Sequence, residues 1–352
     1  MNSTNIFVKR QQQLQKSFAS WGIDAFVCDH PTDIFYLTGM HLSLGRLLVA
    51  PHLVVLFVDG RYEESAKKKA TALVKKLNDE AFLKVLSSKK LKDVRCIGFD
   101  TQTSFAKVEL LKKLIKKQCK MKGLFAPILE LRSIKDASEL KRIKKSAKLL
   151  WEGFLHAKKK LKVGVEERQI ALEFEFYCKE RGAEDLSFTP IIAFGANSAL
   201  PHHLTGRRTL KKGDIVLMDL GVKVDGYASD MTRTFFFGEG STTLQKLYKV
   251  VEDSKEAALE LCRPGVPLTE IDQAARKVMA KAQLEKHFLH SLGHGIGLDV
   301  HESPSFRDKK AVLKPGMVIT IEPGLYLPGS GGVRLEDMVV ITKTCHQNLF
   351  SN

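Results

Sequence analysis

Residues 212–219 read KGDIVLMD, and residues 315–322 read PGMVITIE. Each stretch contains a turn glycine, then an apolar strand, and then a carboxylate six residues after the glycine. A Gly-Val turn at residues 164–165 and another at residues 265–266 open a helix ahead of each stretch. This weak internal repeat predicts a pair of half-domains that face each other through pseudo-twofold symmetry.

Each half also supplies a second carboxylate further along the chain. Asp219 and Glu322 end the two repeated strands, and Asp230 and Glu336 follow them. An ionised carboxylate that is buried without a partner is costly, so a cation is expected beside these acids. Half-domains that face each other would bring all four carboxylates together.

Two arginines and a histidine bear on the identity of that cation. Arg233 or Arg334 could neutralise one buried acid, but four acids exceed what two arginines can neutralise. His294 lies between glycines in the segment 290–301, HSLGHGIGLDVH, and glycines allow close backbone approach. Four carboxylates and one imidazole form an oxygen-rich set that favours Mn²⁺, Fe²⁺ or Co²⁺ over a structural zinc site. Two such ions roughly 3.5 to 4 Å apart can polarise a carbonyl, which predicts hydrolysis of an amide or ester.

Other hydrolytic and nucleotide-dependent chemistries find no motif in the sequence. It contains no GxSxG nucleophile elbow and no GxxxxGK[ST] phosphate loop. The run GSGG at residues 329–332 does not open a helix, so we expect a hairpin turn there rather than a phosphate cradle.

The N-terminal part of the chain alternates helical patterns with short apolar strands, which predicts an α/β domain. The expected strands lie at residues 25–27, 47–50, 54–58 and 96–99. A new unit begins near Asp136, where the sequence DASE has the form of a helix N-cap with an acidic residue at the third helical position. We therefore expect two domains, 1–130 and 131–352.

The composition is typical of a chain that folds in a reducing compartment. Its 352 residues are 44% hydrophobic, which is enough for a sizeable core. The six cysteines are scattered without a CxxC pair, which suits the cytoplasm. The N-terminus lacks an apolar signal region, and no stretch approaches the roughly 18 apolar residues that span a bilayer. We expect a cytoplasmic protein with no membrane partner.

A formal net charge of +16 raises the question of a nucleic-acid partner. Much of the charge lies in lysine runs that are interleaved with apolar residues at helical spacing. The runs are residues 67–69, 75–76, 89–90, 112–113 and 116–117. Solvated outer faces of helices explain such runs better than a binding surface, and aromatic residues do not interleave with them. A nucleic-acid partner is therefore not expected.

Four stretches carry a resemblance to a known family: residues 218–234, 293–302, 321–324 and 333–337. Together they resemble the proline-specific pita-bread metallopeptidases, Xaa-Pro aminopeptidase and Xaa-Pro dipeptidase (prolidase). Residues 33–39 and 58–62 resemble the smaller, creatinase-type N-terminal domain of that group. The resemblance implies an α/β N-terminal domain followed by an α+β pita-bread catalytic domain with a pseudo-twofold internal repeat.

The resemblance also implies a ligand set for two divalent ions. Asp219 would chelate one ion, and Asp230 and Glu336 would bridge the pair. His294 and Glu322 would hold the second ion, and Glu322 would also act as the general base towards water. Mn²⁺ is the first expectation for the metal, with Co²⁺, Fe²⁺ or Zn²⁺ as alternatives.

Further residues acquire roles from the same resemblance. His202 would hydrogen-bond the substrate or stabilise the tetrahedral intermediate, and its neighbour His203 is a weaker candidate for a substrate contact. His301 would assist from the opposite wall, and His290 would line the proline pocket. Arg334 would support a bridging carboxylate, and we place it among the substrate-binding residues.

The leading expectation is a dinuclear metallopeptidase that hydrolyses Xaa-Pro bonds in peptide substrates. The same five ligands serve an aminopeptidase, which we slightly prefer, and a dipeptidase, which is the alternative. A non-catalytic pita-bread binding protein or a metal-free creatinase-like hydrolase would lack metal ligands, whereas all five are present here. The family further implies a homodimer formed through the N-terminal domain.

Overall fold

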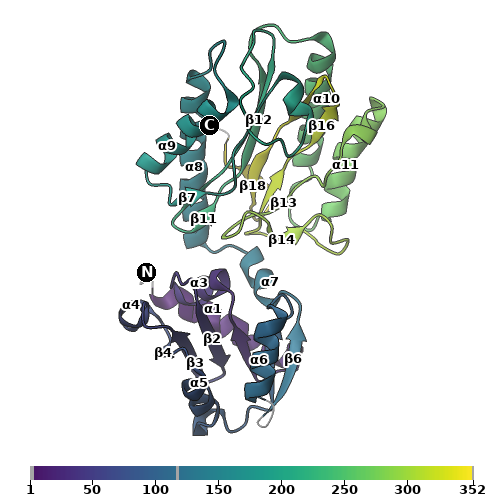
Figure 1. Cartoon of the computed structure of the whole chain (residues 1–352). Helices are drawn as coiled ribbons and strands as arrows, with labels where there is room; N and C mark the ends of the chain where they lie inside the picture. The colour runs from purple at the N-terminus through teal and green to yellow at the C-terminus, as the bar shows by residue number, and fades with distance from the viewer. Residues whose placement is uncertain (1–3, 116–118, 351–352) are drawn as a thin grey trace. The chain divides into compact units, whose positions relative to one another are not determined.

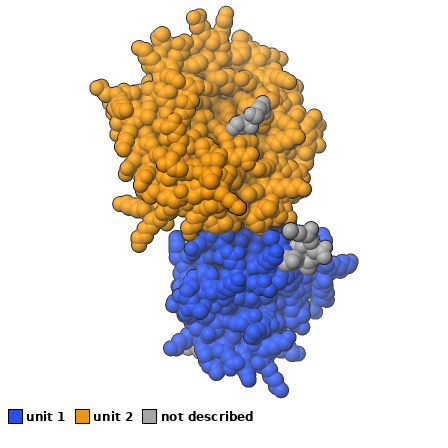
Figure 2. Space-filling model, turned by 180° about the vertical axis from the view of Figure 1, so that it is seen from behind, with its two compact units in different colours: residues 1–132 blue, residues 133–352 orange. Residues whose placement is uncertain are grey.

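The chain forms two compact units, each with its own hydrophobic core. The structure is a computed structural model that describes residues 4–115 and 119–350. One unit comprises residues 1–132 and the other residues 133–352, coloured separately in Figure 2. The first unit ends two residues after the boundary that the sequence predicts.

The first unit is a layered α/β structure around a six-stranded sheet of order β4-β3-β2-β1-β5-β6 (Figure 1). β1 and β3 pair antiparallel with β2, and the remaining pairs are parallel. Apolar side chains of α5 and α6 pack on one face of this sheet against Ala25 and Val27. The elements are α1 (Thr4–Lys16), α2 (Phe18–Trp21), β1 (Ala25–Cys28), α3 (Pro31–Thr38), β2 (Gly45–Ala50), β3 (Leu53–Val58), α4 (Glu63–Lys69), β4 (Leu73–Lys76), α5 (Asp79–Leu86), η1 (Lys89–Leu91), β5 (Cys96–Asp100), α6 (Phe105–Ile115), β6 (Lys120–Leu124) and α7 (Pro127–Ser133).

The four predicted strands of the first unit are confirmed as β1, β2, β3 and β5. The prediction for the lysine runs is partly wrong. Residues 67–69 and 112–113 do lie on helices, and residues 89–90 begin the short η1, but residues 75–76 lie on the edge strand β4. Residues 116–117 lie outside the described residues. Edge strand β6, with exposed Lys120 and Lys122, was not predicted because lysine-rich segments are poor strand formers.

The second unit contains two helix pairs, α8 with α9 and α10 with α11, on opposite sides of the sheets that carry the carboxylates (Figure 1). Its sheets have the orders β12-β9-β8, β14-β13-β15-β18-β19, β11-β10-β7 and β16-β17. The elements are α8 (Ala137–Lys159), α9 (Glu167–Glu180), β7 (Asp185–Leu186), β8 (Ile191–Phe194), η2 (Gly195–Ala199), β9 (Ile215–Leu220), β10 (Val222–Val224), β11 (Tyr227–Ala228), β12 (Met231–Phe236), α10 (Thr242–Leu259), α11 (Leu268–Lys281), η3 (Glu285–His287), β13 (His294–Gly295), β14 (Glu302–Ser305), β15 (Val318–Ile321), β16 (Gly324–Leu327), β17 (Gly331–Arg334), β18 (Asp337–Ile341) and β19 (His346–Asn348).

The internal repeat is confirmed in the backbone of these two halves. Gly164 N donates to Leu210 O at 2.9 Å, and Gly265 N donates to Leu313 O at the same distance. Each glycine has a positive φ, 86° for the first and 87° for the second, which glycine tolerates and other residues rarely adopt. β9 pairs antiparallel with β12, and β15 pairs antiparallel with β18.

The start of the second unit follows the predicted cap. Asp136 Oδ1 accepts hydrogen bonds from the backbone of Ser138 and Glu139, and Glu139 Oε2 accepts one from the Asp136 backbone at 3.0 Å. This reciprocal capping box satisfies the first amide groups of α8. The run at residues 329–332 lies in a hairpin, as expected. It forms part of the turn after β16 and the first two residues of β17.

The cysteines and the longest helices bear on two of the sequence-based expectations. All six cysteines are free, so the fold relies on no disulfide. Among the residues that the structure describes, no helix combines the length and apolar character needed to cross a bilayer.

Candidate metal centre

The predicted ligands come from the ends of paired strands in both halves of the second unit. Asp219 lies in β9 directly opposite Thr232 of β12, and Asp230 precedes β12. Glu322 follows β15, whose last residue faces the start of β18. Glu336 immediately precedes β18 and donates its backbone N–H to Thr232 O at 3.1 Å. Strand pairing therefore brings side chains that are far apart in the sequence to one place.

His294 joins the two halves of the carboxylate cluster. Its Nε2 lies 3.6 Å from Asp230 Oδ2 and 3.5 Å from Glu322 Oε1. One ligand atom from each of Asp230, His294 and Glu336 lies within 4.8 Å of the others, and no other such group occurs among the described residues. The structure thus brings together the acids and the imidazole that the sequence singled out.

Asp219 differs from the other acids because it has an arginine partner. Arg334 Nη2 donates to Asp219 Oδ2 at 2.6 Å, and Arg334 Nε donates to Thr232 Oγ1 at 3.0 Å. Thr232 in turn donates to Glu336 Oε2 at 2.8 Å. The expected link from Arg334 to a bridging carboxylate needs correction, because the arginine contacts Asp219 directly and reaches Glu336 only through the threonine.

Burial dominates the electrostatics of this cluster. It raises the pKa of Asp230 and of Glu322 well above their ordinary values, and neighbouring carboxylates raise them further. It also raises the pKa of Glu336 to about 8. Burial lowers the pKa of His294 to about 4, so its imidazole is neutral at pH 7 and available as a ligand. A divalent cation would stabilise the ionised carboxylates that burial alone disfavours.

Three carboxylate oxygens of the cluster indicate the kind of ligand that it could bind. Asp219 Oδ1, Asp230 Oδ1 and Glu336 Oε1 are buried and have no hydrogen-bond partner. Buried polar atoms in proteins normally have partners, so these oxygens indicate a ligand position. Carboxylate oxygens with one imidazole suit hard divalent ions, and the residues present therefore fit such a metal.

The histidines predicted around the cluster lie in different surroundings. The His301 ring is edge-on to the His294 ring, with centroids 4.3 Å apart. His290 Nε2 lies 2.9 Å from the Tyr326 hydroxyl, which accepts a hydrogen bond from Arg334. Burial lowers the pKa of His290 to about 4, and the nearby charges of Arg334 and His202 contribute. His290 and His301 therefore adjoin the carboxylate cluster, and His202 lies close enough to both to influence their pKa.

His203 has a different partner from the one that the sequence suggested. Its Nε2 lies 2.8 Å from Oε2 of the fully buried Glu167, which also accepts the Gly206 backbone N–H at 3.0 Å. The other oxygen, Glu167 Oε1, accepts hydrogen bonds from Asn197 and the Phe194 backbone. The sequence analysis missed Glu167, because an acidic residue at the start of a helix is usually exposed.

A buried ion pair beside His301 was also missed. Lys135 Nζ lies 2.8 Å from Glu302 Oε1, and the two side chains are 0% and 1% exposed. A Cβ added at Gly297 would overlap this carboxylate, so the glycine leaves room for it. The only sequence signal for this ion pair was Glu302, an acidic residue next to the predicted functional residue His301.

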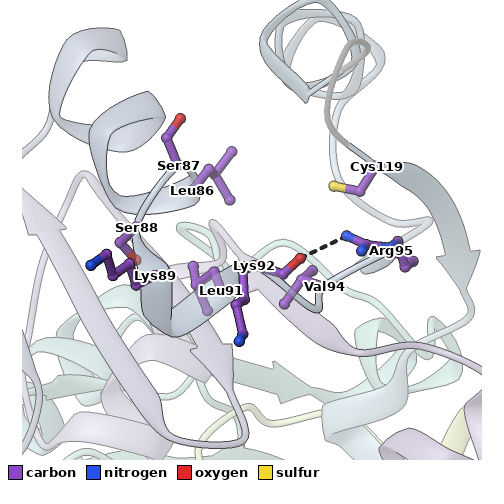
Figure 3. A pocket seen from close by; sticks show the side chains of 9 residues that line it. All are labelled: Leu86, Ser87, Ser88, Lys89, Leu91, Lys92, Val94, Arg95 and Cys119. Atoms are coloured by element: carbon purple, nitrogen blue, oxygen red, sulfur yellow. Dashed lines mark hydrogen bonds between the residues drawn. The ribbon is translucent and has the colours of Figure 1, made fainter.

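A separate hollow occurs in the first unit and plays no part in this cluster. It has a volume of about 420 Å³ and lies between the end of α5 and the start of β6. Figure 3 shows Lys89, Lys92 and Arg95 around it, with side chains that do not converge on a common point. It shares no residue with the carboxylate cluster.

Comparison with known proteins gives a consistent assignment. Residues 141–343 match the model of metallopeptidase family M24, and residues 10–134 match the creatinase/prolidase N-terminal domain. An Xaa-Pro dipeptidase of Pyrococcus horikoshii is 34% identical over 331 residues, which cover 93% of this chain and 92% of the relative. The structure of an Xaa-Pro dipeptidase from Bacillus anthracis matches with a TM-score of 0.93 at 30% identity and covers 98% of both chains. That of an X-Pro aminopeptidase from Thermotoga maritima has a TM-score of 0.87 at 29% identity, and covers 96% of this chain and 98% of the other.

These similarities define the protein as a metallopeptidase with a pita-bread catalytic domain. The chain belongs to metallopeptidase family M24 and carries a creatinase/prolidase N-terminal domain. Family membership implies divalent metal ions, and the three unpartnered carboxylate oxygens agree with that implication.

Proposed function

We propose that this metallopeptidase is an Xaa-Pro dipeptidase, a prolidase. The observation that carries the proposal is a cluster of carboxylates from two strand pairs with three unpartnered buried oxygens beside a neutral imidazole. Two relatives that span nearly all of the chain, the N-terminal domain included, are Xaa-Pro dipeptidases. The dipeptidase alternative is therefore better supported than the aminopeptidase that we preferred from the sequence.

Five residues would hold the metal. Asp219, Asp230, His294, Glu322 and Glu336 supply carboxylate oxygens and one imidazole nitrogen from both halves of the second unit. When bound, the ions would supply Lewis-acid polarisation of the scissile carbonyl. Mn²⁺ is our proposal for the metal because the donors are mostly hard oxygens, with Co²⁺, Fe²⁺ and Zn²⁺ as alternatives.

The remaining chemistry falls to the protein's own side chains. Glu322 accepts the proton of the attacking water, a role that requires its carboxylate to lie within proton-accepting reach of that water. His202 and His301 donate hydrogen bonds to the oxygen that becomes negative in the tetrahedral intermediate. His290 and Arg334, joined through the Tyr326 hydroxyl, form the wall that orients the substrate.

Three wider properties belong to the same proposal. We propose a cytoplasmic enzyme, because its six cysteines are all free. A homodimer through the N-terminal unit is proposed from the family resemblance alone. The excess positive charge is not assigned to nucleic acid, because Lys75, Lys76, Lys120 and Lys122 lie on the two edge strands of the first sheet, where lysine prevents pairing with other chains.

One assay distinguishes the two candidate activities. The Mn²⁺-loaded protein is incubated with Xaa-Pro dipeptides and with Xaa-Pro-Yaa tripeptides of the same first residue, and released amino acids are quantified. We expect rapid hydrolysis of the dipeptides and little of the tripeptides, with Xaa-Ala dipeptides as the matched control for proline. Comparable release of the first residue from both lengths would favour the aminopeptidase, which the Thermotoga maritima structure keeps as the second candidate.

A further inference from the structure

Arg233 forms its ion pair with Asp337 and influences the clustered metal-ligand carboxylate Glu336 only through its charge, although the sequence offered it as a direct partner of a buried acid. Its Nη2 donates to Asp337 Oδ1 at 2.7 Å. Its Nη1 donates to the backbone oxygen of Glu336 and to that of Thr232, the latter at 3.1 Å. One guanidinium therefore holds both the residue that carries a proposed metal ligand and its neighbour.

Two aromatic rings pack against the same side of this guanidinium. Arg233 Cζ lies 5.5 Å from the centroid of the Trp151 ring and 5.5 Å from that of the Phe350 ring. Trp151 belongs to α8, and the centroid of its ring lies 6.5 Å from that of the Phe350 ring. A cation within about 6 Å of two ring faces is attracted to both and loses rotational freedom.

The C-terminal segment that supplies Phe350 is itself fastened to β18. Leu349 N donates to Met338 O at 2.9 Å, and Phe350 N donates to Asn348 Oδ1 at 2.9 Å. Lys255 Nζ donates to Asp337 Oδ2 at 2.7 Å, so Asp337 does not depend on Arg233 alone for its charge balance. The part of the contact that Arg233 adds is its hydrogen bond to the Glu336 carbonyl oxygen, which complements the Glu336 N–H donated to Thr232 O.

We propose that Arg233, packed against Trp151 and Phe350, is a positioning residue that fixes the Glu336 carbonyl group and thereby sets metal affinity. The inference rests on the proposed metal site and extends it to the segment that carries Phe350. Thr232 holds the side chain and the backbone N–H of Glu336, and Arg233 holds its carbonyl oxygen, so consecutive residues of β12 restrain one ligand. Supports of this kind around a ligand reduce the freedom lost when metal binds.

The first test replaces the planar guanidinium of Arg233 with another positively charged group. The full-length protein is stripped of metal with a chelator, and Mn²⁺ alone is titrated calorimetrically. Arg233→Lys retains a cation near Asp337 but cannot hold two acceptors in one plane, so the dissociation constant should rise about 10- to 100-fold.

The second test changes one of the two rings and leaves the arginine in place. Phe350→Leu keeps an apolar cover without a ring face, and the dissociation constant for Mn²⁺ should rise about 2- to 5-fold, as expected for a cation–π contact. Phe350→Tyr restores the ring and should bind as the wild type does. The urea midpoint of each metal-free variant is measured in parallel, because a merely structural ring would change this midpoint and leave the affinity unaltered.

A matched control and two contrary outcomes complete the experiment. Arg181 stacks on Tyr177 at 3.8 Å on an exposed helix end, and Arg181→Lys should leave Mn²⁺ affinity unchanged. If Arg233→Lys fails to fold, Phe350→Leu decides, and an unchanged affinity in that variant overturns the inference. Absence of Mn²⁺ binding by the folded wild type would overturn the proposed function together with this inference, whereas wild-type binding with unchanged variants overturns this inference alone.

Discussion

The two halves of the second unit share one backbone framework. Gly213 in the first half and Gly316 in the second both have a φ of 90°, and each begins a turn that leads into a buried strand. Gly213 N donates to Phe237 O at 2.8 Å, and Gly316 N donates to Ile341 O at 2.8 Å. The framework places one carboxylate of each half at the same position relative to its strand.

The same framework carries different chemistry in each half. Asp219 is paired with Arg334 at 2.6 Å, whereas Oε1 of its counterpart Glu322 lies 3.5 Å from His294 Nε2. The difference shows that the repeat fixes where the carboxylates lie, while residues outside the repeated strands fix which charge each one meets. The halves should therefore respond differently to matched substitutions.

The largest expected effects come from two proposed metal ligands, one in each half. Glu322→Gln should lower kcat by about 10²- to 10⁴-fold, because the amide cannot accept the proton of water.

The first-half change Asp230→Asn should abolish nearly all turnover together with metal binding, since Asp230 forms a group of potential ligands with His294 and Glu336. Initial rates on an Xaa-Pro dipeptide and the metal content of each folded variant measure both effects. Wild-type rates in Glu322→Gln would contradict the assigned base.

The neighbouring histidines of the first half should separate activity from stability. His202→Ala should lower kcat by about 10²-fold, as expected for the loss of a donor to the developing oxyanion. His203→Ala should instead lower the free energy of unfolding by about 1–3 kcal/mol, because it removes a partner of the buried Glu167. Rate measurements and urea unfolding of both variants test the distinction. The reverse pattern would mean that His203 is the substrate contact.

Metal removal should give the protein a pH dependence that arises from Glu336. Burial raises the pKa of this carboxyl from 4.5 to about 8, so the folded state binds the proton more tightly than the unfolded state. The associated stability is present below pH 4.5 and is lost as the pH rises through about 8. Urea unfolding of chelator-treated protein across this range should show the decline, and added Mn²⁺ should remove it. A metal-free protein that gains stability with rising pH would refute this reasoning.

The smallest expected effects are losses of unfolding free energy at the turns that contain Gly213 and Gly316. Gly213→Ala and Gly316→Ala should each cost about 1–3 kcal/mol, because both require positive φ. Gly316→Ala should cost more, since its Cβ would meet Ile134 Cγ2 and Lys135 O at 3.1 Å, against 3.4 Å to Glu239 O at Gly213. Urea unfolding measures the difference.

Gly164 and Gly265 supply the matched control for the comparison of Gly213→Ala with Gly316→Ala. A Cβ at Gly164 or Gly265 would meet no described atom within 4 Å, so alanine at either position adds strain without a clash. Equal losses at this pair, with unequal losses at the later pair, are expected. Equal losses of unfolding free energy at all four positions would mean that the atoms around Gly316 move aside without destabilising the fold.

Much of the catalytic unit could be predicted because its signals are local. The turn glycines, the apolar strands and the carboxylates recur in one order in both halves, and the Asp136 cap marks the start of the unit. Buried acids at strand ends are costly, so the sequence alone indicates a metal. The resemblance then supplied the fold of each domain, which the structure and the comparisons confirm.

The remainder depends on contacts between distant segments. β4 and β6 are strands because neighbouring strands offer them hydrogen bonds, although their lysines are unfavourable for strands. Glu167 is buried because the loop after β8 folds over it, and Lys135 is buried because Glu302 faces it. The pairing of Arg334 with Asp219 joins residues 115 positions apart, and no local pattern reports such a choice.

Metal stoichiometry tests the central claim most directly. The purified protein is loaded with Mn²⁺, dialysed, and analysed for bound metal per folded chain, with Asp230→Asn treated identically. Two ions per wild-type chain and loss of metal from the variant are the predicted result. A folded wild-type chain that retains no metal would contradict the account.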